Sequence, residues 1–203
     1  MQTKAIDQWT RELPIIARRG EIADRNGVTL VGNEDCYSVF VRARSVENAE
    51  IVCSAKKFKG VKHRIEHVKT IGGVDYYNDS KATNVDATVK AIDAMVKPTI
   101  LILGGKDKGL DYCELFEKIK RSQVKSVVIT GESRFRMLDS AKEVGYEKVS
   151  VVEDFYLAID IASLIAKDGD CVLFSPACSS YDKFTDFEQR GNCFIEYLEK
   201  IVE

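Results

Sequence analysis

The sequence of 203 residues predicts an α/β fold: a doubly wound, mostly parallel, Rossmann-like sheet with helices on both faces, plus a small N-terminal remnant. From about residue 74 onward, short apolar strands alternate with amphipathic helices, which is typical of parallel strands joined by crossover helices. The segments ILIL (100–103) and VLF (172–174) are apolar throughout, as expected for central strands buried on both sides. These two observations carry the prediction.

The elements follow from the alternation. We expect strands at Val74–Tyr77, Thr99–Leu103, Ser126–Thr130, Lys148–Val151 and Cys171–Phe174. We expect helices at Val85–Val96, Tyr112–Lys120, Arg134–Val144, Phe155–Lys167 and Phe184–Val202. Before the first of these strands, VKTIGGVDYY predicts a hairpin that turns at Gly72-Gly73. Gly191 lies within the apolar face of the last helix, where glycine costs about 1 kcal/mol relative to alanine, and this predicts close packing against the sheet.

Residues 1–62 show a weaker pattern and are too few to enclose a good core alone. Strand-like pieces occur at Val28–Val31 and Tyr37–Val41, and a helix-like segment spans Val46–Lys57. We therefore divide the chain into residues 1–62, a partial remnant of another domain, and residues 63–203, the Rossmann-like domain.

Composition excludes several function classes. Apolar residues make up 45% of the chain, yet no stretch reaches the roughly 18 apolar residues of a membrane helix, and the N-terminus has no signal-peptide core. The net charge of −2, with both signs interspersed, predicts no nucleic-acid or membrane partner. The cysteines form no C-x-x-C pair, and most lie in apolar runs, as reduced thiols do in cytosolic proteins. We expect a cytoplasmic protein.

Three loops after predicted strands carry polar chemistry. The first loop is NDSKATN (78–84), the second is LGGKDKGL (103–110), and the third is SPACSSY (175–181). Each has a simpler interpretation, as a helix cap, a flexible surface turn and a helix entry, respectively. Ligands of open α/β sheets bind beyond the carboxyl ends of the strands, so we expect the three loops to converge there. The string G-x-x-x-x-G-K-[ST] of a P-loop does not occur in the sequence. No G-x-G-x-x-G follows the first strand either, and this second absence weakens a dinucleotide dehydrogenase interpretation.

The segment HRIEH (63–67) matches the inverted zinc-peptidase pattern H-x-x-E-H. That chemistry needs both histidines on one helix and a third ligand. Here the segment leads into the predicted hairpin, and the chain has only two histidines. We therefore predict no metal site and interpret Arg64 as an anion contact.

Four motifs, in order, resemble the C-terminal domain of the Mur ligases, in particular the D-glutamate-adding members. They are HRIEHV, YYNDSKATN, LGGKDKGLDY and SPACSSYDKFTDFEQRGNCF, which together run from residue 63 almost to the C-terminus. The resemblance implies an ATP-dependent ligase that adds D-glutamate to UDP-N-acetylmuramoyl-L-alanine in peptidoglycan synthesis. In this family the acceptor carboxyl is phosphorylated, and the amine of the incoming amino acid then attacks the acyl-phosphate.

The resemblance also implies roles for individual residues. The positions that match nucleotide contacts are Arg64, Asp79 and Lys81. The positions that match contacts of the amino acid substrate are Thr83, Lys108, Ser180, Tyr181 and Phe187. A guanidinium suits a phosphate, and a carboxylate suits ribose hydroxyls. No residue of the chain is assigned a catalytic role.

A complete enzyme of this family also has a uridine-nucleotide domain and a central ATPase domain, whose motifs do not occur in these 203 residues. The main ligands of ATP and Mg²⁺ are among the missing motifs. We therefore expect a truncated chain that is inactive alone and would bind ATP or ADP, D-glutamate and the UDP-muramoyl acceptor only as part of the whole. The alternative is a stand-alone, non-catalytic ligand-binding or regulatory domain derived from such a ligase.

Overall fold

The computed structural model describes residues 22–23, 29–31 and 60–201, and the chain divides into two compact units, Met1–Lys57 and Phe58–Glu203. In the first unit, the described strands β1 (Ile22–Ala23) and β2 (Thr29–Val31) pair antiparallel. Strand β2 lies within the predicted strand that ends at Val31.

The other elements predicted for the N-terminal region, the strand Tyr37–Val41 and the helix Val46–Lys57, lie outside the described residues. The interpretation of residues 1–62 as a remnant of another domain stays a prediction.

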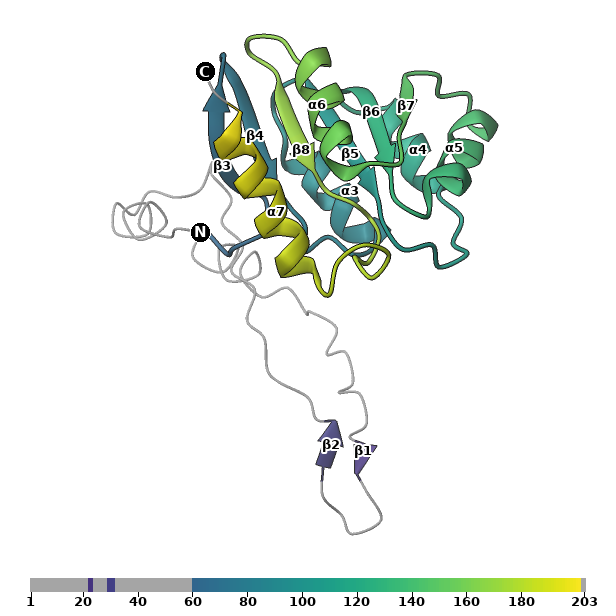
Figure 1. Ribbon diagram of the computed structural model, residues 1–203. Coiled ribbons are helices and arrows are strands. Elements are labelled where there is room, and N and C mark those ends of the chain that lie inside the picture. Colours follow the sequence, from purple (N-terminus) through teal and green to yellow (C-terminus); the bar gives the residue numbers. More distant parts are fainter. Residues whose placement is uncertain (1–21, 24–28, 32–59, 202–203) are drawn as a thin grey trace, which may run out of the picture. The chain divides into compact units, whose positions relative to one another are not determined.

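The second unit contains a six-stranded sheet in the order β3-β4-β8-β5-β6-β7 (Figure 1). Its strands are β3 (Glu66–Ile71), β4 (Val74–Asn78), β5 (Thr99–Gly104), β6 (Val124–Thr130), β7 (Val149–Val151) and β8 (Cys171–Phe174). Strands β4 to β8 are mutually parallel, and β3 pairs antiparallel with β4 through the predicted Gly72-Gly73 turn. Both glycines of the turn have positive φ. The predicted α/β fold with a mostly parallel sheet is confirmed.

The five predicted helices are all present, with small differences at their ends. They are α3 (Val85–Ala94), α4 (Cys113–Lys120), α5 (Arg134–Glu143), α6 (Phe155–Ile165) and α7 (Phe187–Lys200). The prediction that the last helix begins at Phe184 is wrong. Asp186 has an extended backbone and its carboxylate accepts a hydrogen bond from Gln189 N at 2.7 Å, so this aspartate is the N-cap. The predicted end at Val202 lies outside the described residues.

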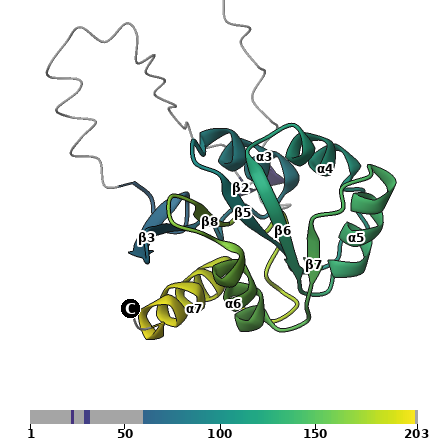
Figure 2. The same cartoon turned by 90° about the horizontal axis from the view of Figure 1, so that it is seen from above.

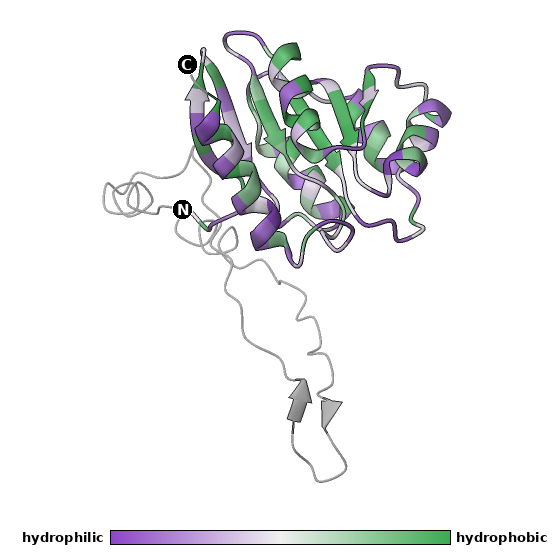
Figure 3. Cartoon of the chain, in the orientation of Figure 1, coloured by the Kyte–Doolittle hydropathy of each residue, from purple (hydrophilic) through white to green (hydrophobic). Residues whose placement is uncertain are grey.

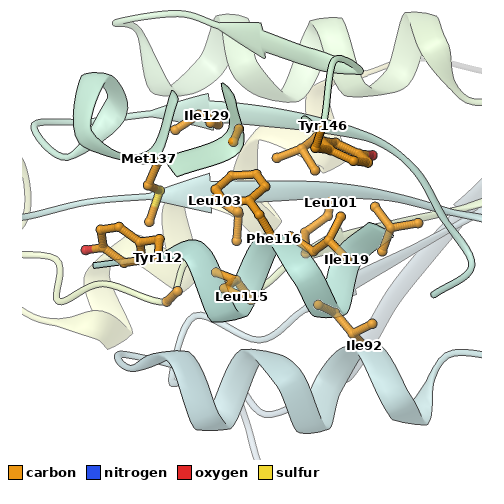
Figure 4. Close-up of a cluster of buried hydrophobic side chains, with 14 of the residues drawn as sticks. Ile92, Leu101, Leu103, Tyr112, Leu115, Phe116, Ile119, Ile129, Met137 and Tyr146 are labelled. Atoms are coloured by element: carbon orange, nitrogen blue, oxygen red, sulfur yellow. The ribbon is translucent and has the colours of Figure 1, made fainter. Parts of the chain in front are cut away.

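The helices cover both faces of the sheet, with α3, α4 and α5 on one face and α6 and α7 on the other (Figure 2). Along β5, Leu101 and Leu103 point to the first face while Ile100 and Ile102 point to the second, and all four are fully buried. Figure 3 shows the strands in the middle of the sheet mostly in green, the hydrophobic end of the scale. Figure 4 shows the cluster of buried hydrophobic side chains on the face covered by α3, α4 and α5, where Phe116 of α4 lies close to Leu101 and Leu103 of β5.

The order of the strands positions the three loops. Strand β8 lies between β4 and β5, so the third loop lies between the first and the second. The chain leaves β4 and β5 toward α3 and α4 on one face, whereas it leaves β8 toward α7 on the other face. Neighbouring connections that diverge to opposite faces open a crevice at the carboxyl edge of a parallel sheet.

Candidate functional site

The three loops meet at the carboxyl edge of the sheet, as the sequence predicts. Asp79 N donates to Phe174 O at 2.8 Å, and Ser175 Oγ donates to the Asp79 carboxylate at 2.7 Å. These bonds connect the first loop to the end of β8 and to the third loop. Lys106 N donates to Ser179 O at 2.9 Å and connects the second loop to the third.

The three residues predicted to bind nucleotide line one cavity of about 290 Å³. The lining residues are Arg64, Ile65, Asp79, Lys81, Ala82, Asn84, Asp86, Ala87 and Lys90. The cations Arg64, Lys81 and Lys90 are exposed, whereas Asp79 is only 4% exposed. The cavity therefore combines exposed positive charge with one recessed carboxylate.

Hydrogen bonds from two neighbouring residues fix the orientation of the Asp79 carboxylate. One carboxylate oxygen accepts from Ser175 Oγ, and the other accepts from Ile65 N at 3.2 Å. Burial raises the pKa of Asp79 to about 6, against the opposing effects of these two hydrogen bonds and of the Arg64 guanidinium. Each carboxylate oxygen can accept more than one hydrogen bond, so the group can still accept from a hydroxyl of a ligand in the cavity.

The N-terminus of α3 opens into the same cavity. Asn84 is the N-cap, and its side chain accepts from Ala87 N at 2.9 Å. Backbone N–H groups at a helix N-terminus favour anions. Lys90, which the sequence interpretation missed, lies on this helix four residues after Asp86. That helical spacing is the signal by which the lysine could have been found.

The second loop is tethered to neighbouring elements just before Lys108 and is closed by a hydrogen bond within the loop. Lys106 pairs with Glu132 at 2.7 Å, and the Asp107 carboxylate accepts from Arg136 Nε at 3.0 Å and from Gly109 N at 2.9 Å. Lys108 itself is exposed, and no carboxylate among the described residues pairs with it. Its ammonium lies near enough to the third loop to lower the pKa of the Cys178 thiol, which burial raises more strongly.

The other predicted substrate residues differ in burial. Ser180 is 2% exposed, and its carbonyl accepts from Lys183 N and Phe184 N in the turn that leads to α7. The Tyr181 side chain is 70% exposed. Phe187, the first residue of α7, lies with its ring centroid 5.3 Å from Lys81 Nζ.

Phe187 links the two groups of predicted residues. Its carbonyl accepts from Ser80 Oγ at 2.8 Å, which attaches the start of α7 to the first loop. Thr83 is partly buried in the same loop, where its N–H donates to Lys81 O. The structure therefore brings the residues predicted to bind nucleotide together around one cavity, and it places the residues predicted to bind the amino acid along the three loops and at the start of α7.

The two histidines of HRIEH lie in different surroundings. His63 precedes β3, is 4% exposed, and its Nδ1 lies 2.9 Å from Asn78 Nδ2. His67 lies on β3, and its Nε2 lies 3.2 Å from Thr70 Oγ1. The segment is not a helix, so it lacks the geometry that the zinc pattern requires.

The prediction that Gly191 packs closely is confirmed, but its main neighbour is His63. A Cβ at Gly191 would lie 2.3 Å from His63 Nδ1, and the Gly191 carbonyl accepts from Asn78 Nδ2 at 3.3 Å. The contact is thus made to the segment before β3 and to the end of β4.

Arg190 is a further residue that the sequence interpretation missed. It lies in the first turn of α7 and is 2% exposed. Its guanidinium donates to the first loop at Ser80 and to the third loop at Cys178. No local signal distinguishes this arginine from an exposed helical one, because its partners are more than ten residues away in the chain.

Within residues 60–201 and the two short described strands, no helix has the length and apolar character needed to cross a membrane. The same residues contain no group of three or more His, Cys, Asp or Glu side chains arranged to hold a metal ion.

The chain is similar to a known family of enzymes. The family model described as the glutamate ligase domain of Mur ligase matches residues 63–178. A UDP-N-acetylmuramoylalanine--D-glutamate ligase from Lachnospira eligens is 44% identical over 160 residues, which cover 79% of this chain and 35% of that protein. The ligase of the same name from Caldicellulosiruptor saccharolyticus is 46% identical over 146 residues, covering 72% of this chain and 32% of that protein. The chain therefore spans about a third of the length of these relatives.

A solved structure shows the same fold at low sequence identity. The bifunctional folylpolyglutamate synthase/dihydrofolate synthase from Yersinia pestis superposes with a TM-score of 0.50 at 13% identity. The match covers 73% of this chain and 34% of that protein. At this identity the likeness supports the fold alone.

Proposed function

We propose, from the premise that this chain belongs to the Mur ligase family, that it forms the amino-acid- and nucleotide-binding part of an ATP-dependent ligase. The proposed reaction adds D-glutamate to UDP-N-acetylmuramoyl-L-alanine, in line with the name that the relatives carry, UDP-N-acetylmuramoylalanine--D-glutamate ligase. We propose that this step belongs to peptidoglycan synthesis. One observation carries the proposal. The cavity lined by Arg64, Lys81 and Lys90 and the second loop, which carries Lys108, lie at the same edge of the sheet.

The cavity suits a nucleotide. Arg64, Lys81 and Lys90 would bind phosphate oxygens, assisted by the N-terminus of α3. Asp79 would accept a hydrogen bond from a ribose hydroxyl, because it is the one carboxylate of the cavity that is recessed and fixed by neighbouring hydrogen bonds. In the whole enzyme, ATP supplies the phosphoryl group that activates the acceptor carboxyl.

The second and third loops suit a dicarboxylate amino acid. Lys108 would pair with a carboxylate of D-glutamate, and Ser180 would donate a hydrogen bond to it. Thr83 would bind the same ligand from the first loop, while Tyr181 and Phe187 would contact it through backbone groups. The two residues before Lys108 are anchored to Glu132 and Arg136, which lowers the entropy lost when the lysine becomes ordered on its ligand.

The chemical step requires parts that these residues do not supply. The 203 residues contain no P-loop string, and the described residues contain no cluster of metal ligands. We therefore propose that this chain binds its ligands weakly and does not form the acyl-phosphate by itself, whereas the longer enzyme uses ATP and Mg²⁺.

Two lysine variants test whether the two ligand sites are distinct. Lys90→Ala is expected to weaken ADP binding about tenfold and leave the affinity for D-glutamate unchanged, measured by NMR titration of the 203-residue chain. Lys108→Ala is expected to do the reverse, since removal of one charge-assisted contact costs roughly 1.5–3 kcal/mol. Lys118→Ala is the matched control, because this lysine pairs with Asp93 between α3 and α4, away from the loops.

The proposal is wrong if the wild-type chain shows no response to either ligand at tens of millimolar. Loss of both affinities in both variants would show that the sites are not separate. Ligase turnover by the 203-residue chain with ATP, Mg²⁺ and acceptor would contradict the assignment of the chemical step to other parts of the enzyme.

A further inference from the structure

Arg190 connects elements that are distant in the sequence. Its Nε donates to Ser80 Oγ at 3.0 Å, and its Nη2 donates to Ser80 O at 2.9 Å and to Cys178 O at 3.0 Å. Ser80 belongs to the first loop and Cys178 to the third. One planar group therefore holds both loops at a defined separation.

The same guanidinium also contacts the second loop. A Cβ built on Gly105 would lie 3.0 Å from Arg190 Nη1 and 2.4 Å from Ser179 O. Any larger residue at position 105 would push against the guanidinium and the third loop at once. Arg190 thus lies where all three loops meet.

The burial of this charge is unusual for a purely structural residue. No carboxylate among the described residues lies within ion-pair distance of Arg190, and its Nη1 has no protein acceptor there. Burial lowers the pKa of Arg190 to about 10, and Asp182, across a small cavity of about 10 Å³, partly offsets this effect. Burying a cation without a partner carboxylate is unfavourable, and apolar side chains at this position would avoid that penalty.

We propose that Arg190 is the positioning residue of the candidate site, a single buried guanidinium that sets the relative placement of the three loops and so prepares both ligand sites. The proposal rests on the function proposed above for the identity of the ligands. Its physical basis is the rigid fork of the guanidinium, which reaches three acceptors on two loops, whereas an ammonium cannot match this geometry. Arg190 acts through the loops and touches no ligand itself.

Two substitutions of Arg190 test the proposal in the 203-residue chain. Arg190→Lys keeps the charge but not the fork, and we expect affinities for ADP and D-glutamate at least fivefold weaker. Amide hydrogen exchange should accelerate at Lys106 and Lys81, whose N–H groups bond Ser179 O and His63 O, while the strands stay protected. Arg190→Ala should show the same losses, and millimolar guanidinium should restore binding by occupying the space left by the side chain.

Phe194→Leu separates positioning from general stability. Phe194 is fully buried on the same helix and stacks on Phe174 with ring centroids 5.0 Å apart, and its cluster of buried hydrophobic residues contains none of the residues of the three loops. We expect this variant to lose stability and to keep both affinities, with no gain from guanidinium. Equal loss of affinity in Phe194→Leu and Arg190→Lys would overturn the proposal, and so would wild-type affinity and loop exchange in Arg190→Lys.

The two proposals can fail separately. If the wild-type chain binds neither ADP nor D-glutamate, the proposed function fails, and the loop-specific hydrogen exchange of Arg190→Lys still decides the positioning role. If Arg190→Ala does not fold, Arg190→Lys provides the same comparison with the charge retained.

Discussion

Replacing Asp79 with asparagine is expected to remove a loss of stability that the wild type undergoes as the pH rises to neutral, and to weaken nucleotide binding at the same time. Burial raises the pKa of Asp79 from 3.8 to about 6. Between pH 3.8 and about pH 6, the Asp79 carboxyl is protonated in the folded protein but ionised in the unfolded chain. This stabilising contribution is fully present below pH 3.8 and is lost as the pH rises through about 6.

The magnitude follows from the pKa difference. At roughly 1.4 kcal/mol per pKa unit, the ionised carboxylate lowers the free energy of unfolding at pH 7.5 by about 3 kcal/mol relative to strongly acidic pH. Asparagine does not ionise and avoids this loss. The stability of Asp79→Asn minus that of the wild type should therefore increase by about 2.5 kcal/mol between pH 4 and pH 7.5.

Urea denaturation of both proteins at several pH values measures this difference. Changed hydrogen bonds to Ser175 and Ile65 shift the whole curve by a constant, so the slope and not the absolute value is the test. A difference that does not vary with pH would refute the reasoning, as would a carboxyl ¹³C titration of Asp79 with a midpoint near 4. Weaker ADP binding by a variant without this pH-dependent loss would show that the buried carboxylate serves binding at the expense of stability at neutral pH.

Three further predictions concern the framework of the site. Gly104→Ala should lower the free energy of unfolding by about 3 kcal/mol or more in urea denaturation, because φ is +116° and the new Cβ would lie 1.8 Å from Thr130 O; unchanged stability would contradict this contact. Gly191→Ala should destabilise the protein, although alanine favours a helix by about 1 kcal/mol relative to glycine, because the new Cβ would lie 2.3 Å from His63 Nδ1. In a His63→Ala background this clash is removed, so the same substitution should stabilise the protein. A change in stability of the same sign in both backgrounds would refute this explanation. Asp186→Ala should cost about 1 kcal/mol and speed amide exchange in the first turn of α7, whereas unaltered exchange would show that the cap is unimportant.

Patterns within one element predicted most of the fold. The run ILIL specifies a strand buried on both faces, and Gly72-Gly73 specifies the hairpin, since both signals depend only on neighbouring residues. The sequence predicts a start of α7 at Phe184, three residues too early, because Phe184 continues the apolar stripe of this helix. The stripe records which residues face the core, whereas the helix begins where the Asp186 cap satisfies its first N–H groups.

The residues of the candidate site also fall into those that short motifs reveal and those that only the packed structure reveals. Arg64, Asp79 and Lys81 could be recognised from short motifs, and the structure places them around one cavity. Lys90 carries only a weak local signal, its position four residues after Asp86 on α3, and Arg190 carries none that distinguishes it from an ordinary helical cation. Their importance comes from the surfaces that α3 and α7 face after packing.

Local sequence patterns are sufficient to specify the alternating strands and helices and the polar loops that follow the strands, because hydrophobic periodicity and turn chemistry act over a few residues. Tertiary structure alone decides that β8 lies between β4 and β5 and brings the loops after these strands together. It also decides that Arg190 is buried where they meet. Strand order depends on pairing between segments some 70 to 100 residues apart, as between Thr99 and Cys171 or Asn78 and Phe174, and no local pattern records such pairing.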